Sequence, residues 1–98
     1  MPAVARKGDK FSTGHACTTE STLTGPSADV LVNNLGVERK GDPSVSHTVK
    51  SGKKCVPHLV KISNGSSSVI VNNVPVARVG DAIDSGKISS GSPDVFVG

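Results

Sequence analysis

Aromatic side chains are almost absent from this chain: among its 98 residues there is no tryptophan or tyrosine, and phenylalanine occurs only twice. Apolar residues make up 35% of the sequence, and most are valine, with 15 valines against 4 leucines and 4 isoleucines. A core of such residues buries little area, and the chain is near the lower size limit for folding on a core alone. We therefore expect one domain, residues 1–98, with a metal, a disulfide or a partner as a further source of stability.

Long apolar runs and concentrated charge are also missing. No segment is long enough to span a membrane, and the N-terminus lacks the charged and then apolar segments of a signal peptide. The net charge of +3 is spread along the chain, and the one pair of adjacent lysines, Lys53-Lys54, has no aromatic residue beside it. These absences predict a soluble protein made in the cytoplasm, with no nucleic-acid partner and no use of the general secretory route.

What the sequence does contain is a threefold repeat. The motif Arg-x-Gly-Asp begins at Arg6, Arg39 and Arg78, and each copy leads through a stretch of variable length into a Gly/Ser turn and a short valine-rich strand. Glycine followed by aspartate is typical of a turn in which the carboxylate accepts backbone hydrogen bonds. Such a composition favours short strands over helices. The pattern predicts an all-β domain with approximate threefold symmetry within one chain, its repeats at about 2–37, 38–76 and 77–98.

The three valine-rich strands, at residues 30–34, 69–73 and 95–98, are apolar on both faces. Alternate residues of a strand point to opposite sides, so either the valines or Leu31, Ile70 and Phe96 could surround a threefold axis. One face is then expected to be covered by a neighbouring unit and the other by a partner protein. The expected docking residues are the six valines in phase, Val30, Val32, Val69, Val71, Val95 and Val97.

The candidate metal ligands lie in the variable loops. His15 lies six residues beyond the aspartate of its repeat and His47 lies five beyond the aspartate of the next, so both should approach the threefold axis. Cys55 and His58 have the spacing of a tight metal-binding turn. Together His15, His47, Cys55 and His58 would close a tetrahedral site for one structural metal ion, with zinc favoured over iron.

Several alternatives to this site remain open. Cys17 follows His15 by two residues, so on an extended segment it would point to the same side and could replace Cys55 as the sulfur ligand. A Cys17–Cys55 disulfide is a further alternative, although nothing indicates an oxidising compartment. A small metallohydrolase would need an open coordination position and a general base, and neither glutamate, Glu20 or Glu38, accompanies the ligands. We therefore expect that the protein is not an enzyme. A zinc-stabilised adaptor, which would be a binding module, remains an alternative function.

Several separate motifs resemble those of the PAAR-repeat proteins. The signature Pro-Ala-Ala-Arg is approximated by Pro-Val-Ala-Arg at 75–78 and Pro-Ala-Val-Ala-Arg at 2–6, while the middle copy at 35–39 has changed to Leu-Gly-Val-Glu-Arg. The Gly-Asp that follows is present in all three copies. The Gly-His-x-Cys string at 14–17 and the closing segment 91–98 also look like the family, so the resemblance covers essentially the whole chain.

The resemblance implies a cone of short β-strands and hairpins with a metal held by His and Cys near its apex. Such proteins cap the trimeric β-helical spike, VgrG-like or of a phage tail, of a type VI secretion system or phage baseplate. The expected complex has one tip monomer per trimer, contacts the target-cell membrane transiently, and is found in the phage virion or secreted with the spike. Ser85 departs from a cysteine that is frequent in the third repeat of the family, which argues against a ligand from that loop. With no toxin domain after the third strand, the chain is expected to be a bare tip.

Overall fold

The computed structural model describes all 98 residues, and its only regular elements are β-strands. The ten strands are β1 Lys10–Ser12, β2 Glu20–Thr22, β3 Leu31–Val32, β4 Leu35–Gly36, β5 His47–Ser51, β6 Lys54–His58, β7 Ile70–Val71, β8 Val74–Pro75, β9 Ala82–Ile83 and β10 Gly86–Lys87. They pair as five antiparallel hairpins, each made of two consecutive strands. The chain forms no helix that could cross a membrane. The predicted all-β class is confirmed.

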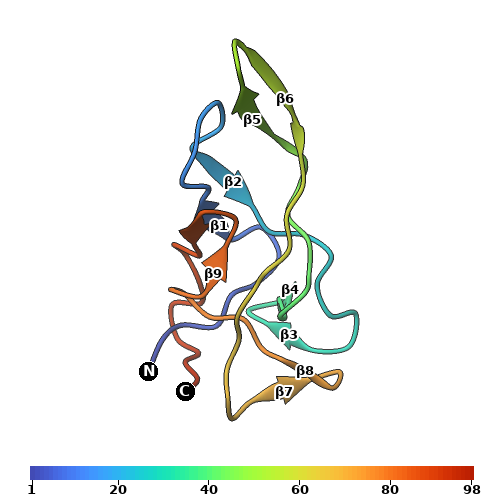
Figure 1. Ribbon diagram of the computed structural model, residues 1–98. Coiled ribbons are helices and arrows are strands. Elements are labelled where there is room, and N and C mark those ends of the chain that lie inside the picture. The colour runs from blue at the N-terminus through green and yellow to red at the C-terminus, as the bar shows by residue number, and fades with distance from the viewer.

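The molecule is elongated, with principal extents of 42 × 24 × 21 Å. The β5–β6 hairpin forms one narrow end, which we call the apex (Figure 1). The β3–β4 and β7–β8 hairpins and both chain termini lie toward the other, broader end, which we call the base (Figure 1). This arrangement agrees with the predicted cone.

A closed ring of backbone hydrogen bonds marks the threefold axis. The N–H of Ala5 donates to the carbonyl of Ala77 (3.0 Å), that of Ala77 to Glu38 (2.9 Å), and that of Glu38 back to Ala5 (3.0 Å). Each of these residues directly precedes the arginine of an Arg-x-Gly-Asp motif. Because the ring closes on itself with one residue from each repeat, the three repeats surround a common axis, as the sequence predicts.

The Arg-x-Gly-Asp motifs are turns closed by their own side chains. In the first, the carboxylate of Asp9 accepts hydrogen bonds from the backbone N–H (2.7 Å) and the Nε–H (3.0 Å) of Arg6. The glycine between them, Gly8, has φ +89°, a conformation that favours glycine. The other two motifs repeat these contacts. Each carboxylate is thus committed to the turn, and its hydrogen bond raises the pKa of the arginine.

Two apolar clusters fill the interior. The larger consists of Ala5, Phe11, Leu23, Ile62, Ala77, Ile83 and Ile88. The smaller consists of Val4, Val37, Val71 and Val76, with Val32, Val69, Val95 and Val97 packed against it. Because β3 and β7 belong to the base, this valine cluster lies there (Figure 1).

The structure corrects the predicted docking face. Of the six valines expected there, only Val30 is exposed; Val71 is buried and the other four pack against the valine cluster. The alternation along each segment instead turns Leu31, Ile70 and Phe96 outward, with exposed fractions of 59%, 56% and 48%. The predicted strand at 95–98 is reduced to an isolated bridge between Ala3 and Phe96. The sequence could not choose between the two phases because both are apolar, and closure around the axis selects the narrower valine side chains for the interior.

Candidate metal centre

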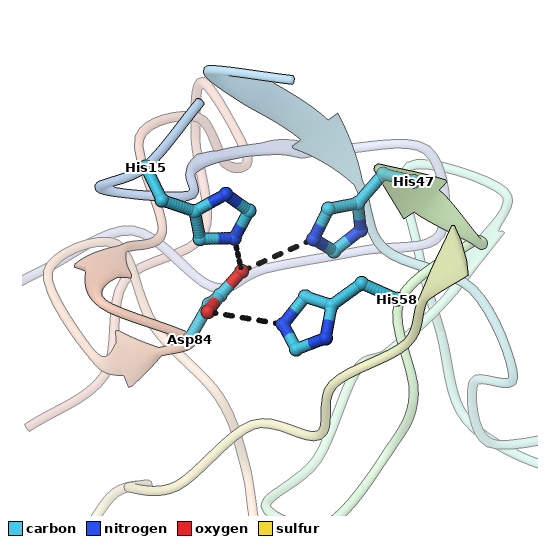
Figure 2. Close-up of side chains that lie close together, drawn as sticks. All are labelled: His15, His47, His58 and Asp84. Carbon is cyan, nitrogen blue, oxygen red and sulfur yellow. Dashed lines mark hydrogen bonds and ion pairs between the residues drawn. The ribbon is translucent and has the colours of Figure 1, made fainter. Parts of the chain in front are cut away.

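Three histidines and one aspartate converge beneath the apex (Figure 2). His15 lies in the loop between β1 and β2, and His47 and His58 face each other as the first register pair of β5 and β6. Asp84 lies in the turn between β9 and β10, with φ +56°. The hairpin that follows the Arg-x-Gly-Asp motif in each repeat therefore contributes at least one side chain to this His₃Asp cluster.

The four side chains are close enough to share one ion. Asp84 Oδ2 lies 2.5 Å from His15 Nε2 and 3.1 Å from His47 Nε2, while its Oδ1 lies 3.4 Å from His58 Nε2. One potential ligand atom from each residue lies within 4.8 Å of the others. Metal–nitrogen and metal–oxygen bonds of about 2.0–2.2 Å around a tetrahedral zinc ion need ligand separations inside this limit. The cluster could therefore hold a metal ion.

Hydrogen bonds at the far side of the rings orient two of the histidines. His15 Nδ1 lies 3.0 Å from the carbonyl oxygen of Ala16, and His47 Nδ1 lies 3.2 Å from that of Val45. A carbonyl oxygen only accepts, so each Nδ1 carries a proton, and Nε2 is the ring nitrogen left to bind a cation. Metal-binding histidines commonly have this outer contact.

Three imidazoles and one carboxylate therefore meet at the centre of the cluster. Desolvation raises the pKa of Asp84, but hydrogen bonding to His15, His47 and His58 outweighs it and leaves that pKa below its usual value. The two oxygens of Asp84 and the three Nε2 atoms that face them are carboxylate and imidazole donors of the kind that zinc prefers. The donor set therefore fits a metal ion.

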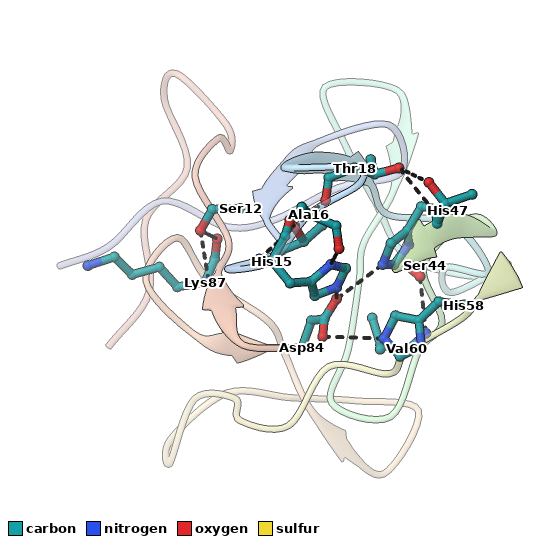
Figure 3. A network of polar contacts seen from close by, with 12 residues as sticks. Ser12, His15, Ala16, Thr18, Ser44, His47, His58, Val60, Asp84 and Lys87 are labelled. Atoms are coloured by element: carbon teal, nitrogen blue, oxygen red, sulfur yellow. Dashed lines mark hydrogen bonds and ion pairs between the residues drawn. The ribbon is translucent and has the colours of Figure 1, made fainter. Parts of the chain in front are cut away.

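Polar contacts hold the three hairpins together around the cluster (Figure 3). The hydroxyls of Thr18 and Thr48 lie 2.8 Å apart and link the His15 loop to β5. The hydroxyl of Ser12 donates to the carbonyl oxygen of Lys87 at 3.3 Å and links β1 to β10. These contacts join segments far apart in the sequence, so the histidines and the aspartate are held in place by the fold.

The predicted sulfur ligand is corrected by the structure. Cys55 forms a disulfide with Cys17, so neither thiol belongs to the His₃Asp cluster. The spacing of Cys55 and His58 predicts a metal-binding turn, but both residues lie in β6. Residues three apart in a strand point to opposite faces, so Cys55 cannot accompany His58 to the centre. The disulfide, left open as an alternative by the sequence, is present.

Asp84 is the member of the cluster that the sequence reasoning missed. Ser85 argues against a ligand from the third repeat, but the His₃Asp cluster includes Asp84 from that repeat. Asp84 lies three residues beyond Asp81, whereas His15 and His47 lie six and five residues beyond the aspartates of their own repeats. A search that allowed this shorter offset and included carboxylates would have identified it.

The disulfide joins the His15 loop to the hairpin that carries His47 and His58. We expect reduction, or the double variant Cys17→Ser/Cys55→Ser, to lower the free energy of unfolding by about 3–4 kcal/mol, because the bond closes a loop with a sequence separation of 38 residues. Thermal melting with and without reductant measures the effect. The double variant is the control, since reductant should leave its melting temperature unchanged. Equal melting of oxidised and reduced wild type would contradict the prediction.

Comparison with known proteins gives one family. The family model described as the PAAR motif matches residues 7–86, a span that contains the three Gly-Asp turns and all four members of the His₃Asp cluster. No curated protein matches the chain. The match covers most of the sequence, and the predicted resemblance is confirmed. The chain belongs to the PAAR-motif family.

Proposed function

We propose that this chain is a non-enzymatic structural tip, one monomer of which caps the trimeric β-helical spike of a contractile injection machine. Membership of the family implies a spike-tip protein of phage tails or type VI secretion systems. The observation that carries the finer proposal is the base: β3, β7 and the C-terminal segment 95–98 each expose one large apolar side chain. A single chain of this kind offers nearly the same contact to each subunit of a trimer.

The docking face of the proposal consists of Leu31, Ile70 and Phe96, which we call the apolar base. They occupy the same position in their repeats, directly before Val32, Val71 and Val97. Large exposed apolar side chains gathered at one end of a small domain are typical of an interaction site. Because the three side chains are equivalent around the axis, they match a threefold-symmetric partner. This favours a trimeric partner over an asymmetric partner.

A rigid apex supports the mechanical role. We propose that the His₃Asp cluster holds one structural metal ion, with zinc favoured over iron for a set of three imidazoles and one carboxylate. When bound, the ion would fix the loops of three hairpins to one another. No cleft opens beside the cluster, which supports a structural role for the site over a catalytic one.

A charge in the apolar base should prevent docking. Ile70→Asp would bury an unpaired carboxylate against the spike, which costs several kcal/mol, so we expect its affinity for the trimer to fall at least about a hundredfold. Leu59→Asp is the matched control, because Leu59 has the same exposed fraction as Ile70, 56%, and lies directly after β6, away from the apolar base. The affinity of each variant is measured against a recombinant spike trimer recovered by pull-down with the wild-type chain.

Native mass spectrometry of the purified complex gives the stoichiometry. One tip per trimer supports the proposal. Three tips per trimer, or an Ile70→Asp variant that binds as tightly as wild type, would show that the repeats serve another purpose.

A further inference from the structure

Three lysines occupy the outer end of the β5–β6 hairpin. Lys50, Lys53 and Lys54, which we call the lysine prong, are all exposed, as is the whole segment that joins them. Figure 1 places this hairpin at the far end of the molecule from both termini. The hairpin turn contains Gly52, whose φ of +62° favours glycine. The outermost surface of the apex is therefore positively charged.

The charge of the prong has no counter-charge within the molecule. No acidic residue occurs between Asp42 and Asp81, so the hairpin and the segments that flank it are free of carboxylates. The ion pairs join arginine or histidine to aspartate, and none includes a lysine. Of the remaining carboxylates, Asp29 and Asp94 accept hydrogen bonds from the side chains of Asn72 and Asn33. Glu38 is buried, and the exposed Glu20 forms no ion pair with a lysine.

The prong is also held rigidly at its root. Lys50 pairs in register with Cys55, so the disulfide to Cys17 lies directly beneath the turn that carries the other two lysines. The N–H of Lys50 donates to the carbonyl of Ala16 at 2.7 Å, a second link from the hairpin to the His15 loop. A prong braced in this way loses little backbone entropy when it contacts a surface, which favours binding by a few charges.

We propose that the lysine prong binds the phosphate groups of an anionic lipid bilayer, and so makes the first contact of the tip with its target membrane. The orientation rests on the proposed function, in which the base docks on the spike and the apex points outward. Lysine ammonium groups act as point charges that attract phosphate without a fixed geometry. A membrane surface is broad enough to meet all three lysines at the end of a narrow hairpin.

Nucleic acid fits these observations less well. Single strands are bound by basic grooves whose aromatic side chains stack on bases, and the prong has neither aromatic residues nor a groove. All three arginines, which would recognise phosphate bidentately, are committed to the Arg-x-Gly-Asp turns. The prong therefore has the chemistry of a non-specific contact with a charged surface.

Vesicle flotation of the full chain tests the proposal. Vesicles of phosphatidylcholine alone are compared with vesicles that also contain phosphatidylglycerol, for wild type and for Lys50→Gln/Lys53→Gln/Lys54→Gln. An anionic bilayer contributes about 1 kcal/mol for each nearby lysine, roughly fivefold, so the variant should lose about a hundredfold in partitioning to anionic vesicles. Binding of wild type should weaken as salt is raised.

The matched control is Lys40→Gln/Lys61→Gln/Lys87→Gln, which removes the same charge from exposed lysines outside the hairpin. It should retain nearly all of the wild-type partitioning. An equal loss in both variants, no preference for anionic vesicles, or tighter binding of wild type to duplex DNA than to anionic vesicles would overturn the proposal. Binding to the spike trimer is measured on the same samples. A chain that docks but ignores vesicles overturns only the membrane contact, whereas a chain that fails to dock overturns the proposed function.

Discussion

Asp84→Asn should reduce the metal content of the purified protein from about one ion per chain to a small fraction of that. The substitution removes the only carboxylate of the His₃Asp cluster and leaves three imidazoles. Structural zinc sites have apparent binding energies of about 10–16 kcal/mol in small peptides, and binding energy of this kind is folding energy. The affinity should therefore fall by more than about a hundredfold, the upper end of the loss seen when only an outer partner of a ligand is removed.

Asparagine suits this test because it isolates the charge. Asp84 has φ +56°, a left-handed conformation that asparagine adopts readily, so the turn between β9 and β10 should keep its shape. Elemental analysis gives the metal content, and competition with a chelator gives the affinity. Thermal melting with and without chelator should separate wild type from the variant, since only wild type has a bound ion to lose.

Two controls make the outcome decisive. Ser85→Ala changes the neighbouring exposed residue and should leave the metal content unchanged. Cys17→Ser/Cys55→Ser should melt at a lower temperature but still bind about one ion per chain, because no sulfur belongs to the cluster. Metal retained in Asp84→Asn and lost in the double cysteine variant would return sulfur to the ligand set and refute the His₃Asp assignment.

The fold followed from the sequence because the repeat constrains it strongly. Three copies of Arg-x-Gly-Asp, each followed by a short apolar strand, leave few arrangements other than three units around an axis. The sequence does not show which face of each valine-rich segment is buried, since adjacent residues such as Ile70 and Val71 are both apolar. Only the packing of three units around the axis decides which of them is buried, and that packing is not a local property of the sequence.

The site was predicted only in part, for local reasons. His15 and His47 were placed together by their equivalent offsets, and the structure brings them together with His58. Cys55 was assigned wrongly because a spacing of three residues points to one side in a turn but to opposite sides in a strand. Asp84 was overlooked because an aspartate after a Gly-Asp turn looks like ordinary turn chemistry. Ligand identity here depends on which hairpins meet at the apex, and that contact is formed by residues distant in sequence.

Glu38 should make the protein less stable as the pH rises from about 4.5 to about 8. The side chain is fully buried, and neither carboxylate oxygen has a hydrogen-bond partner. It lies on the ring around the threefold axis, where the other two repeats have Ala5 and Ala77. Burial, the largest cause, and the nearby charges of Asp42 and Asp9 raise the pKa of Glu38 to about 8, against the opposing effects of Arg39 and Lys7.

The direction of this change in stability follows from the protonation of Glu38 in the folded and the unfolded chain. Below pH 4.5, the ordinary pKa of a glutamate, the side chain is protonated in both the folded and the unfolded chain, and its contribution to stability is fully present. Between pH 4.5 and about 8 the unfolded chain ionises while the folded chain keeps its proton, so the free energy of unfolding falls. At 1.36 kcal/mol for each pH unit, the loss over this window is about 4–5 kcal/mol.

Glu38→Ala restores the residue found in the other two repeats, so the buried carboxyl is removed without a change in the backbone pattern. Urea unfolding at a series of pH values gives the free energy of unfolding of each protein. The free energy of unfolding of Glu38→Ala should rise relative to that of wild type as the pH is raised to 8. Glu20→Ala, which removes an exposed glutamate, should follow the wild-type curve. If the difference between Glu38→Ala and wild type is constant with pH, Glu38 is ionised in the folded state, and a cation or a proton donor must compensate it at the axis.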